Sequence, residues 1–424
     1  MTIIVLLLVI GALLVLRVPV AFAFLGPGLA YLVLTGQSVG LAMRLVTNST
    51  ASFPLLAVPL FVLLGAVANH AGIADRLFDF ALALLGRVRG GLGYVSIGVS
   101  LGFSWMSGSA VADAAALGKV QIPAMVRNGY TRPFGLGVTG AAALIAPVMP
   151  PSIPAVIYAG LAAVSTGALF AASVVPALLM ALGLCVVVFV LVRRQPDIVR
   201  TGFSWSEVRR TGLRVVGPLG APVIILGGIL YGLFTPTEAA AVGALYILLL
   251  GFAYRTVSVR DLPRIFAETV MTTAAIMLIV SSAALLGYVL ARERVPQQLS
   301  ELLLGMTDDP TVFLVLVAVL MLVLGTVVDP TAVLVLTVPI LLPISLRFGV
   351  DPIVLGVLVI LSLMIGLLTP PVGTVLYVLS SVTKAPVSEV FKGTVPFLVP
   401  LLAICVLIIL APSVVTALPE ALGL

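Results

Sequence analysis

The sequence contains very little charge and few residue types that carry out chemistry. Of its 424 residues, 9% are Asp, Glu, Lys or Arg, one is histidine and two are cysteine. A soluble globular domain carries about 25% charged residues, so the composition excludes that class. The sequence also lacks a P-loop, a GxSxG motif and any His/Cys spacing typical of a metal site. We therefore expect neither an enzyme nor an ATP-driven pump.

Long uncharged runs occupy most of the chain, and 61% of its residues are hydrophobic. A membrane-crossing helix needs about 20 apolar residues. The first run has no basic segment and no small-residue cleavage site, so we interpret it as a retained helix rather than a signal peptide. The predicted fold is an all-α polytopic membrane protein. Ten crossings are expected near residues 1–16, 19–35, 53–69, 134–161, 168–192, 215–233, 236–253, 267–290, 351–381 and 394–411, and re-entrant hairpins near 91–120 and 309–345.

The basic residues predict the orientation. Residues 193–214 form a hydrophilic linker with six arginines and only Asp197 and Glu207 as acidic residues. Because Lys and Arg accumulate in cytoplasmic loops, we place this linker in the cytoplasm and both termini outside. All basic residues then lie on the cytoplasmic side except Arg44, Arg292, Arg294 and Arg347.

The linker separates two halves, 1–192 and 215–424, that share a pattern of Pro and Gly. One constant offset aligns Pro123, Gly129 and Pro150–Pro151 with Pro343, Gly349 and Pro370–Pro371. Each half has five expected crossings, an odd number, so the second half would insert upside down relative to the first. Such inverted repeats are typical of secondary transporters. Chance matching of Gly and Pro in apolar sequence is the alternative.

Each half contains a polar hairpin tip and a proline-rich break. In the first half these are the tip from Ser107 to Asp113 and the segment PVMPPSIP; in the second they are LGTVVDPTAVL and IGLLTPPVGTVLY. Non-helical backbone at membrane depth is tolerated where protein buries it or where it lines a wet cavity. Exposed carbonyl groups suit a small cation, and helix N-termini suit an anion. We expect a sodium-like ion at each tip and an anionic substrate between them.

The residues assigned to the substrate are Ser107, Ser109, Asp113, Pro150, Pro151, Ser152, Thr331, Pro370, Pro371 and Gly373. Two structural alternatives stay open. The Pro-Pro pairs are also compatible with simple kinks supported by neighbouring helices. Asp113 and Asp329 are equally compatible with a role as helix caps.

Several motifs in order resemble those of one family. SGSAVADAAALG, IPAMVRNGY, PPSIPAVIYAG, FTPTEAAAVGALY, DPTAVLVLTVPILLPI and IGLLTPPVGTVLYV resemble the large membrane subunit of the tripartite ATP-independent periplasmic (TRAP) transporters, over nearly the whole chain. The resemblance implies an elevator-type carrier, with a transport domain moving in a scaffold, in a bacterial or archaeal inner membrane. It implies coupling to sodium ions, no organic cofactor, a small four-helix membrane subunit, and a periplasmic binding protein that delivers an organic acid such as a C4-dicarboxylate or sialic acid.

The resemblance also implies two sodium sites. The first would be formed by Ser107, Gly108, Ser109, Ala146 and Pro150, and the second by Gly325, Thr326, Asp329, Gly366 and Thr369. The sequence departs from the family pattern in two places, because Gly is common where Ala146 stands and Asn is common where Ser362 stands. No Lys or Arg lies at either tip, so anion recognition would rest on helix ends and hydroxyl groups, with fine selectivity left to the binding protein.

Two other functions compete with this interpretation. A self-sufficient divalent-anion/sodium symporter would share the hairpins and breaks but would need neither a small subunit nor a binding protein. A membrane scaffold subunit that does not transport would keep the fold alone.

Overall fold

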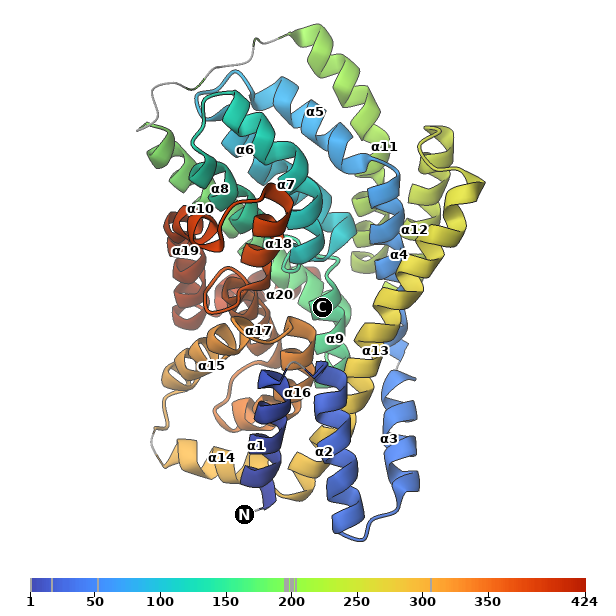
Figure 1. Cartoon of the computed structure of the whole chain (residues 1–424), viewed down its shortest axis with the longest axis vertical. Coiled ribbons are helices and arrows are strands. Elements are labelled where there is room, and N and C mark those ends of the chain that lie inside the picture. The colour runs from blue at the N-terminus through green and yellow to red at the C-terminus, as the bar shows by residue number, and fades with distance from the viewer. Residues whose placement is uncertain are drawn as a thin grey trace.

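The computed structural model describes residues 2–16, 18–51, 53–193, 198, 202, 204–305 and 307–424, and within these ranges the chain forms helices and no strand (Figure 1). The first half contains α1 (Thr2–Val15), α2 (Val20–Leu34), α3 (Val39–Thr50), η1 (Phe53–Leu56), α4 (Ala57–His70), α5 (Ile73–Leu85), α6 (Gly91–Ser107), α7 (Ala110–Arg127), α8 (Arg132–Ala143), α9 (Ile153–Ala162) and α10 (Thr166–Val192). The second half contains α11 (Trp205–Leu230), α12 (Pro236–Ala253), η2 (Val259–Asp261), α13 (Leu262–Arg292), α14 (Val295–Leu304), α15 (Pro310–Gly325), α16 (Pro330–Arg347), α17 (Pro352–Gly366), α18 (Thr374–Thr383), α19 (Val387–Leu410) and α20 (Ser413–Leu422).

Six helices of the described chain are long and apolar enough to cross a membrane, and a seventh span is possible if the bent pair α3 and α4 is counted as one. The six spans are Thr166–Val192, Trp205–Leu230, Pro236–Ala253, Val259–Arg292, Pro330–Arg347 and Val387–Leu410. The expected crossings 134–161 and 351–381 each consist of two helices joined by a break, so neither is one continuous helix. The described residues therefore form an all-helical membrane protein, as the sequence predicts. The number of helices long enough to cross is six or seven, fewer than the ten crossings expected.

The boundary between the halves differs from the expected linker. Helix α11 begins at Trp205 and continues to Leu230, so the last ten residues of the predicted linker 193–214 are helical. Arg194, Asp197 and Arg200 of that linker lie outside the described residues. The hydrophilic connection is shorter than predicted because the apolar face of a helix already begins at Val208, which is buried.

The helices form two groups. In the first, which we call the scaffold group, α4 packs against α12 and α13, and α13 packs against α2 and α3. In the second, which we call the break group, α8 packs against α19, α7 against α18, and α15 against α17. Figure 1 shows α4, α12 and α13 along one side of the molecule and α8, α10 and α19 along the other. The break group also includes α6, α9 and α16, which pack on its other helices, and the two groups meet where α4 contacts α6 and where α13 contacts α16.

Local chemistry explains why the helices of the break group start where they do. Ser109, Ser152 and Asp329 precede α7, α9 and α16, and each side chain accepts a hydrogen bond from a backbone N–H of the first turn. Such caps satisfy N–H groups that have no partner within the helix. The two breaks contain cis peptide bonds at Pro150–Pro151 and Pro370–Pro371.

Candidate functional site

The first hairpin tip is a tight turn between α6 and α7. Helix α6 ends at Ser107, and Gly108 adopts a positive φ of 59°, a conformation that glycine reaches at little cost. Ser109 then caps α7, accepting from the N–H of Ala112 at 3.4 Å. The cap of this helix is therefore Ser109, and Asp113 lies in the first turn beyond it.

Asp113 is fully buried and is held by the tip. The hydroxyl of Ser107 donates a hydrogen bond to Oδ1 of Asp113. The other carboxylate oxygen, Oδ2, has no hydrogen-bond partner among the residues that the structure describes. A buried carboxylate oxygen without a partner is costly, so this oxygen is available to a cation or a donor that binds at the tip.

The first tip touches the first break. A β-carbon on Gly108 would lie 3.5 Å from the carbonyl oxygen of Pro151 and 3.4 Å from the backbone nitrogen of Ile153. Within the break, Ser152 Oγ donates to the carbonyl oxygen of Pro147 at 2.5 Å and accepts from the N–H of Ala155 at 3.2 Å. Ala146 and Pro150, the other members of the first expected sodium site, lie buried in the same break. The structure thus brings tip and break together, and the ion itself stays a prediction.

The second tip is joined to the second break by backbone hydrogen bonds. The carbonyl oxygen of Thr326 accepts from the N–H groups of Val372, at 3.2 Å, and Gly373, at 2.8 Å. Nearby, a β-carbon on Gly366 would lie 2.7 Å from the carbonyl oxygen of Leu322, so α15 and α17 cross without a side chain at this point. Gly325, Thr326 and Gly366 of the second expected sodium site are therefore neighbours.

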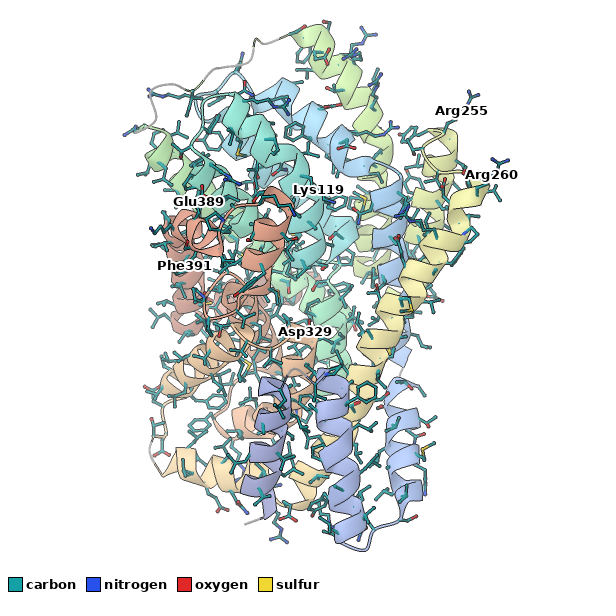
Figure 2. The ribbon with its side chains drawn as sticks, in the orientation of Figure 1. Lys119, Arg255, Arg260, Asp329, Glu389 and Phe391 are labelled. Atoms are coloured by element: carbon teal, nitrogen blue, oxygen red, sulfur yellow. The ribbon has the colours of Figure 1, made fainter. Side chains whose placement is uncertain are left out.

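Polar side chains of the second tip and of the second break form hydrogen bonds to nearby backbone groups. Asp329 Oδ1 accepts from the N–H groups of Thr331, at 2.9 Å, and Ala332, at 3.4 Å, so this residue caps α16. Thr369 Oγ1 donates to the carbonyl oxygen of Ile365 at 3.0 Å, which leaves the lone pairs of its hydroxyl free. Asp329 lies near the middle of the molecule (Figure 2). Asp113 and Asp329 thus differ, since only Asp329 is a cap.

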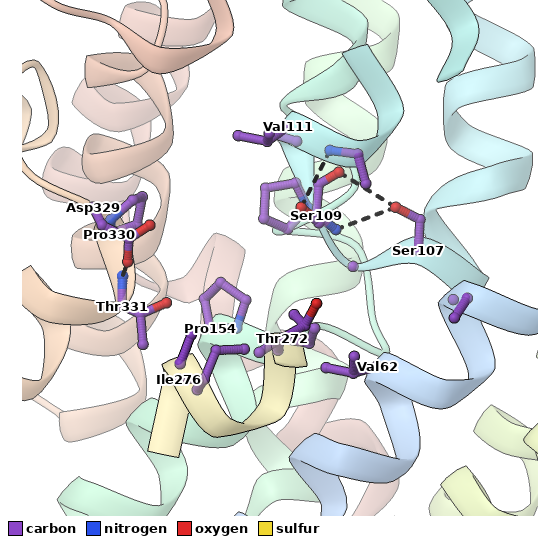
Figure 3. A pocket seen from close by; sticks show the side chains of 18 of the residues that line it. Val62, Ser107, Ser109, Val111, Pro154, Thr272, Ile276, Asp329, Pro330 and Thr331 are labelled. Atoms are coloured by element: carbon purple, nitrogen blue, oxygen red, sulfur yellow. Dashed lines mark hydrogen bonds between the residues drawn. The ribbon is translucent and has the colours of Figure 1, made fainter. Parts of the chain in front are cut away.

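A cavity of about 710 Å³ separates the two tips. Figure 3 shows Ser107 and Ser109 on one side, Asp329 and Thr331 on the other, and Pro154 of α9 between them. Helices α4 and α13 of the scaffold group complete the wall. They contribute the polar residues Asn69, Glu268 and Thr272 together with several apolar residues. Small-molecule sites have volumes of about 300 to 1,000 Å³, so the cavity has the size of a site for a small organic molecule.

The lining includes some of the residues assigned to the substrate and leaves out others. Ser107, Ser109 and Thr331 line the cavity. The remaining seven lie outside its described lining: Asp113, Pro150, Pro151, Ser152, Pro370, Pro371 and Gly373. Of these, Asp113 accepts a hydrogen bond from Ser107, and Ser152 donates one to Pro147 within the first break. Both residues therefore lie behind the residues that line the cavity. A role for any of them in substrate binding stays a prediction.

Sequence reasoning missed the scaffold side of the cavity. Glu268 of α13 lines it and is paired with Arg264, whose Nε lies 3.1 Å from Glu268 Oε1, and with His70, whose Nε2 lies 3.9 Å from Oε2. Asn69 of α4 and Thr272 of α13 lie on the same wall. Glu268 is the last charged residue before the uncharged run 269–291, so its position at the edge of an apolar segment was the only signal in the sequence.

The charged residues in the described lining of the cavity are both acidic, namely Glu268 and Asp329. Favourable groups for an anion come instead from helix ends, because α7, α9 and α16 all begin at the cavity and contribute Ala110, Pro154 and Thr331. The N-terminus of a helix carries partial positive charge and free N–H groups. Among the described residues no cluster of three His, Cys, Asp or Glu side chains forms a site for a transition metal.

The fold resembles that of a known membrane transporter. The solved structure of the Alcanivorax borkumensis YdaH transporter matches with a TM-score of 0.63 over 86% of each chain, at 18% sequence identity. The two chains therefore share a fold.

The sequence comparisons are more specific. The family described as "Tripartite ATP-independent periplasmic transporter, DctM component" matches residues 6–414. The chain is 42% identical over 404 residues to the sialic acid TRAP transporter large permease protein SiaM of Vibrio cholerae, covering 95% of both chains. It is 37% identical over 402 residues to the C4-dicarboxylate TRAP transporter large permease protein DctM of Pseudomonas aeruginosa, covering 94% of both.

A third relative is longer. The isethionate TRAP transporter permease protein DctMQ of Oleidesulfovibrio alaskensis is 34% identical over 412 residues, which are 95% of this chain and 64% of that protein. The chain belongs to the DctM-component family of the TRAP transporters, as its motifs indicate.

Proposed function

We propose that this chain is the transporting subunit of a sodium-coupled importer of an organic acid. The observation that carries the proposal is the cavity between the two tips, each of which is in contact with a helix break. Relatives are named for sialic acid, C4-dicarboxylates and isethionate, all small organic anions. The substrate proposed here is a carboxylate of this size, with sialic acid and C4-dicarboxylates as the first candidates.

Sodium ions would bind where tip and break meet. At the first site, the ligands proposed are oxygens of Ser107, Gly108 and Ser109 together with carbonyl groups of the break at Ala146 and Pro150. At the second site, they are oxygens of Gly325, Thr326, Asp329, Gly366 and Thr369. The oxygen Oδ2 of Asp113, in the first turn of α7, has no hydrogen-bond partner in the described chain, and neither does Thr374 Oγ1, which follows the second break. Spare oxygens beside both sites support binding of a small hard cation.

The charge of the cavity wall gives a reason for coupling. Glu268 and Asp329 repel an anion, although Arg264, which is paired with Glu268, offsets part of that repulsion from outside the described lining. A sodium ion at each tip would cancel this repulsion and strengthen the attraction of the helix N-termini. Substrate would therefore bind well only after sodium, which is the condition for symport.

The movement proposed is an elevator. The break group, with both tips and both breaks, would slide as one body against the scaffold group, and the cavity would open alternately to the two sides of the membrane. Two features support this division: the cavity lies at the boundary between the groups, and the short helices α5 and α14 connect them. The inverted relation of 1–192 and 215–424 would supply the two conformations.

The partners proposed follow from the family. TRAP transporters are tripartite by name, and the DctMQ relative is longer than this chain. We therefore propose a small four-helix membrane subunit and a periplasmic binding protein that delivers the acid, with the chain in the inner membrane of a bacterium or archaeon.

Uptake into proteoliposomes tests the proposal. The chain is reconstituted with its small subunit, and accumulation of radiolabelled organic acids is measured with and without an inward sodium gradient and the binding protein. Uptake that needs both is expected. Uptake with sodium alone, by this chain alone, would identify a self-sufficient symporter, and absence of uptake under every condition would support a scaffold subunit.

A further inference from the structure

A second cavity lies on the scaffold group, away from the transport cavity. It has a volume of about 170 Å³ and is lined entirely by apolar side chains. Its walls are α12 and α13, with Leu245 and Phe266 among their residues, and α4 contributes Leu63 and Val67. Both α12 and α13 pack on α4, so the cavity is a groove with α4 as its floor.

The groove opens on the surface of two candidate membrane spans, α12 and α13. Leu245 is 57% exposed and Phe266 is 48% exposed, so its rim is uncovered in this chain. A helix with side chains is about 10 Å across, which is too wide for a hollow of this volume. An extended hydrocarbon chain suits both the width and the apolar lining.

Cationic groups stand at one end of the groove. Helix α13 enters the lining at Leu262, directly after the connection that carries Arg255 and Arg260. Figure 2 shows both arginines projecting outward from this connection. Neither makes a hydrogen bond or an ion pair with any residue that the structure describes.

Three neighbouring charged residues interact with other parts of the chain. Arg264 is paired with Glu268 at 3.1 Å, and Arg76 lies over the ring of Tyr254 at 3.8 Å. The carboxylate of Asp261 accepts from the N–H and hydroxyl of Ser258 at 2.8 and 2.7 Å. Arg255 and Arg260 are thus free guanidinium groups on the connection itself, and a guanidinium matches the geometry of a phosphate.

We propose that the groove between α4, α12 and α13 is a binding site for an anionic phospholipid. One acyl chain lies in the groove, and the phosphate is held by Arg255 and Arg260. On the topology proposed above, these arginines face the cytoplasm, where basic pockets between helices recognise anionic headgroups. Since α13 also lines the transport cavity through Glu268 and Thr272, the lipid braces one wall of that cavity.

Lipid titration of the purified full chain in detergent tests this site. Thermal stability and lipid adducts in native mass spectrometry are followed with phosphatidylglycerol, with phosphatidylcholine of the same acyl chains, and with inorganic phosphate. The variants are Arg255→Gln/Arg260→Gln and Ala241→Phe, which places a ring at an exposed residue of the groove lining. The control is Arg127→Gln/Arg209→Gln, two exposed arginines elsewhere.

We expect phosphatidylglycerol to raise the melting temperature and phosphatidylcholine to have little effect. The double arginine variant should bind phosphatidylglycerol roughly tenfold more weakly, because each basic residue near an anionic surface contributes to binding, while the control binds normally. Ala241→Phe should lose the lipid adduct. Equal shifts with both lipids, or normal binding by both variants, would mean bulk lipid only and would overturn the proposal. A shift with inorganic phosphate alone, or loss of the adduct when the small subunit is added, would overturn it in favour of a free anion or a protein contact.

Discussion

Gly325 and Gly366 face each other where α15 crosses α17, and neither has room for a side chain. A β-carbon on Gly366 would lie 2.7 Å from the carbonyl carbon of Gly325, and one on Gly325 would lie 2.6 Å from the carbonyl oxygen of Leu363. The atoms in the way are backbone, so they cannot rotate aside. The second tip is therefore held against the second break by the absence of two side chains.

Replacing Gly366 with valine should disturb the second sodium site. The new side chain must push α15 away from α17, and overpacking of this kind costs about 1–3 kcal/mol. We expect the sodium concentration for half-maximal uptake to rise about tenfold or more, measured in proteoliposomes. Gly287→Val on α13 is the control, because no atom lies within 4 Å of a β-carbon there. An unchanged sodium response in Gly366→Val would remove this site from the proposal.

Removing the hydroxyl of Ser107 should destabilise the first tip through Asp113. The carboxylate would lose its one side-chain partner in the described structure while staying fully buried. Leaving a buried polar group unsatisfied costs about 1–3 kcal/mol. The melting temperature of Ser107→Ala, measured without sodium, should fall by several degrees. Ser104→Ala is the matched control on the same helix, since its hydroxyl bonds only the carbonyl of Leu101 within α6. Equal melting temperatures for the two variants would contradict the importance of the Ser107–Asp113 contact.

Neutralising Glu268 should make substrate binding easier. Glu268→Gln removes one of the two carboxylates in the described lining of the cavity and releases Arg264 from its ion pair. Both changes favour an anion. At the moderate polarity of a wet cavity we expect the effect to be on the order of 1 kcal/mol, or roughly a fivefold lower KM for the acid. Uptake is measured over a range of substrate concentrations at saturating and at low sodium. A higher KM would show that Glu268 contacts the substrate favourably, against this account.

Labelling at Gly202 tests the orientation. Gly202 lies in the connection before α11, and a side chain there would meet no atom within 4 Å. A cysteine at this position, after replacement of Cys185 and Cys405, should react with an impermeant thiol reagent in inside-out vesicles. Reaction in intact spheroplasts would reverse the proposed topology.

The sequence predicted those parts of the site that depend on local chain chemistry. Proline and glycine favour breaks in a helix, so Pro150–Pro151 and Gly108 indicated a break and a tip. Other prolines, such as Pro123 and Pro176, lie inside continuous helices, so residue type alone did not fix the position of a break. Packing decided the rest. Asp113 and Asp329 look alike in sequence, yet one is buried behind Ser107 and the other caps a helix at the cavity.

The cavity wall formed by α4 and α13 could not be predicted from the sequence either. Asn69 and Thr272 line the cavity only because α4 and α13 pack side by side, a contact between segments about 200 residues apart that no local pattern records. Helix lengths were also predicted only in part. The apolar runs indicated a membrane protein. The runs 134–161 and 351–381, however, are each divided into two helices at their Pro-Pro pairs.

Crosslinking the two groups tests the elevator. Ala66 of α4 and Val111 of α7 both line the transport cavity, one from the scaffold group and one from the break group. If the break group slides against α4, a cleavable bifunctional thiol reagent joining Ala66→Cys to Val111→Cys should stop uptake, and reduction should restore it. Each single cysteine variant, treated identically, should transport at its untreated rate. Substrate binding by the crosslinked protein is measured as well, because the reagent joins two residues that line the cavity. Binding that persists identifies arrested motion, whereas loss of binding identifies a blocked site. Full uptake by the crosslinked protein would mean that access alternates by local gating, with the two groups fixed relative to each other.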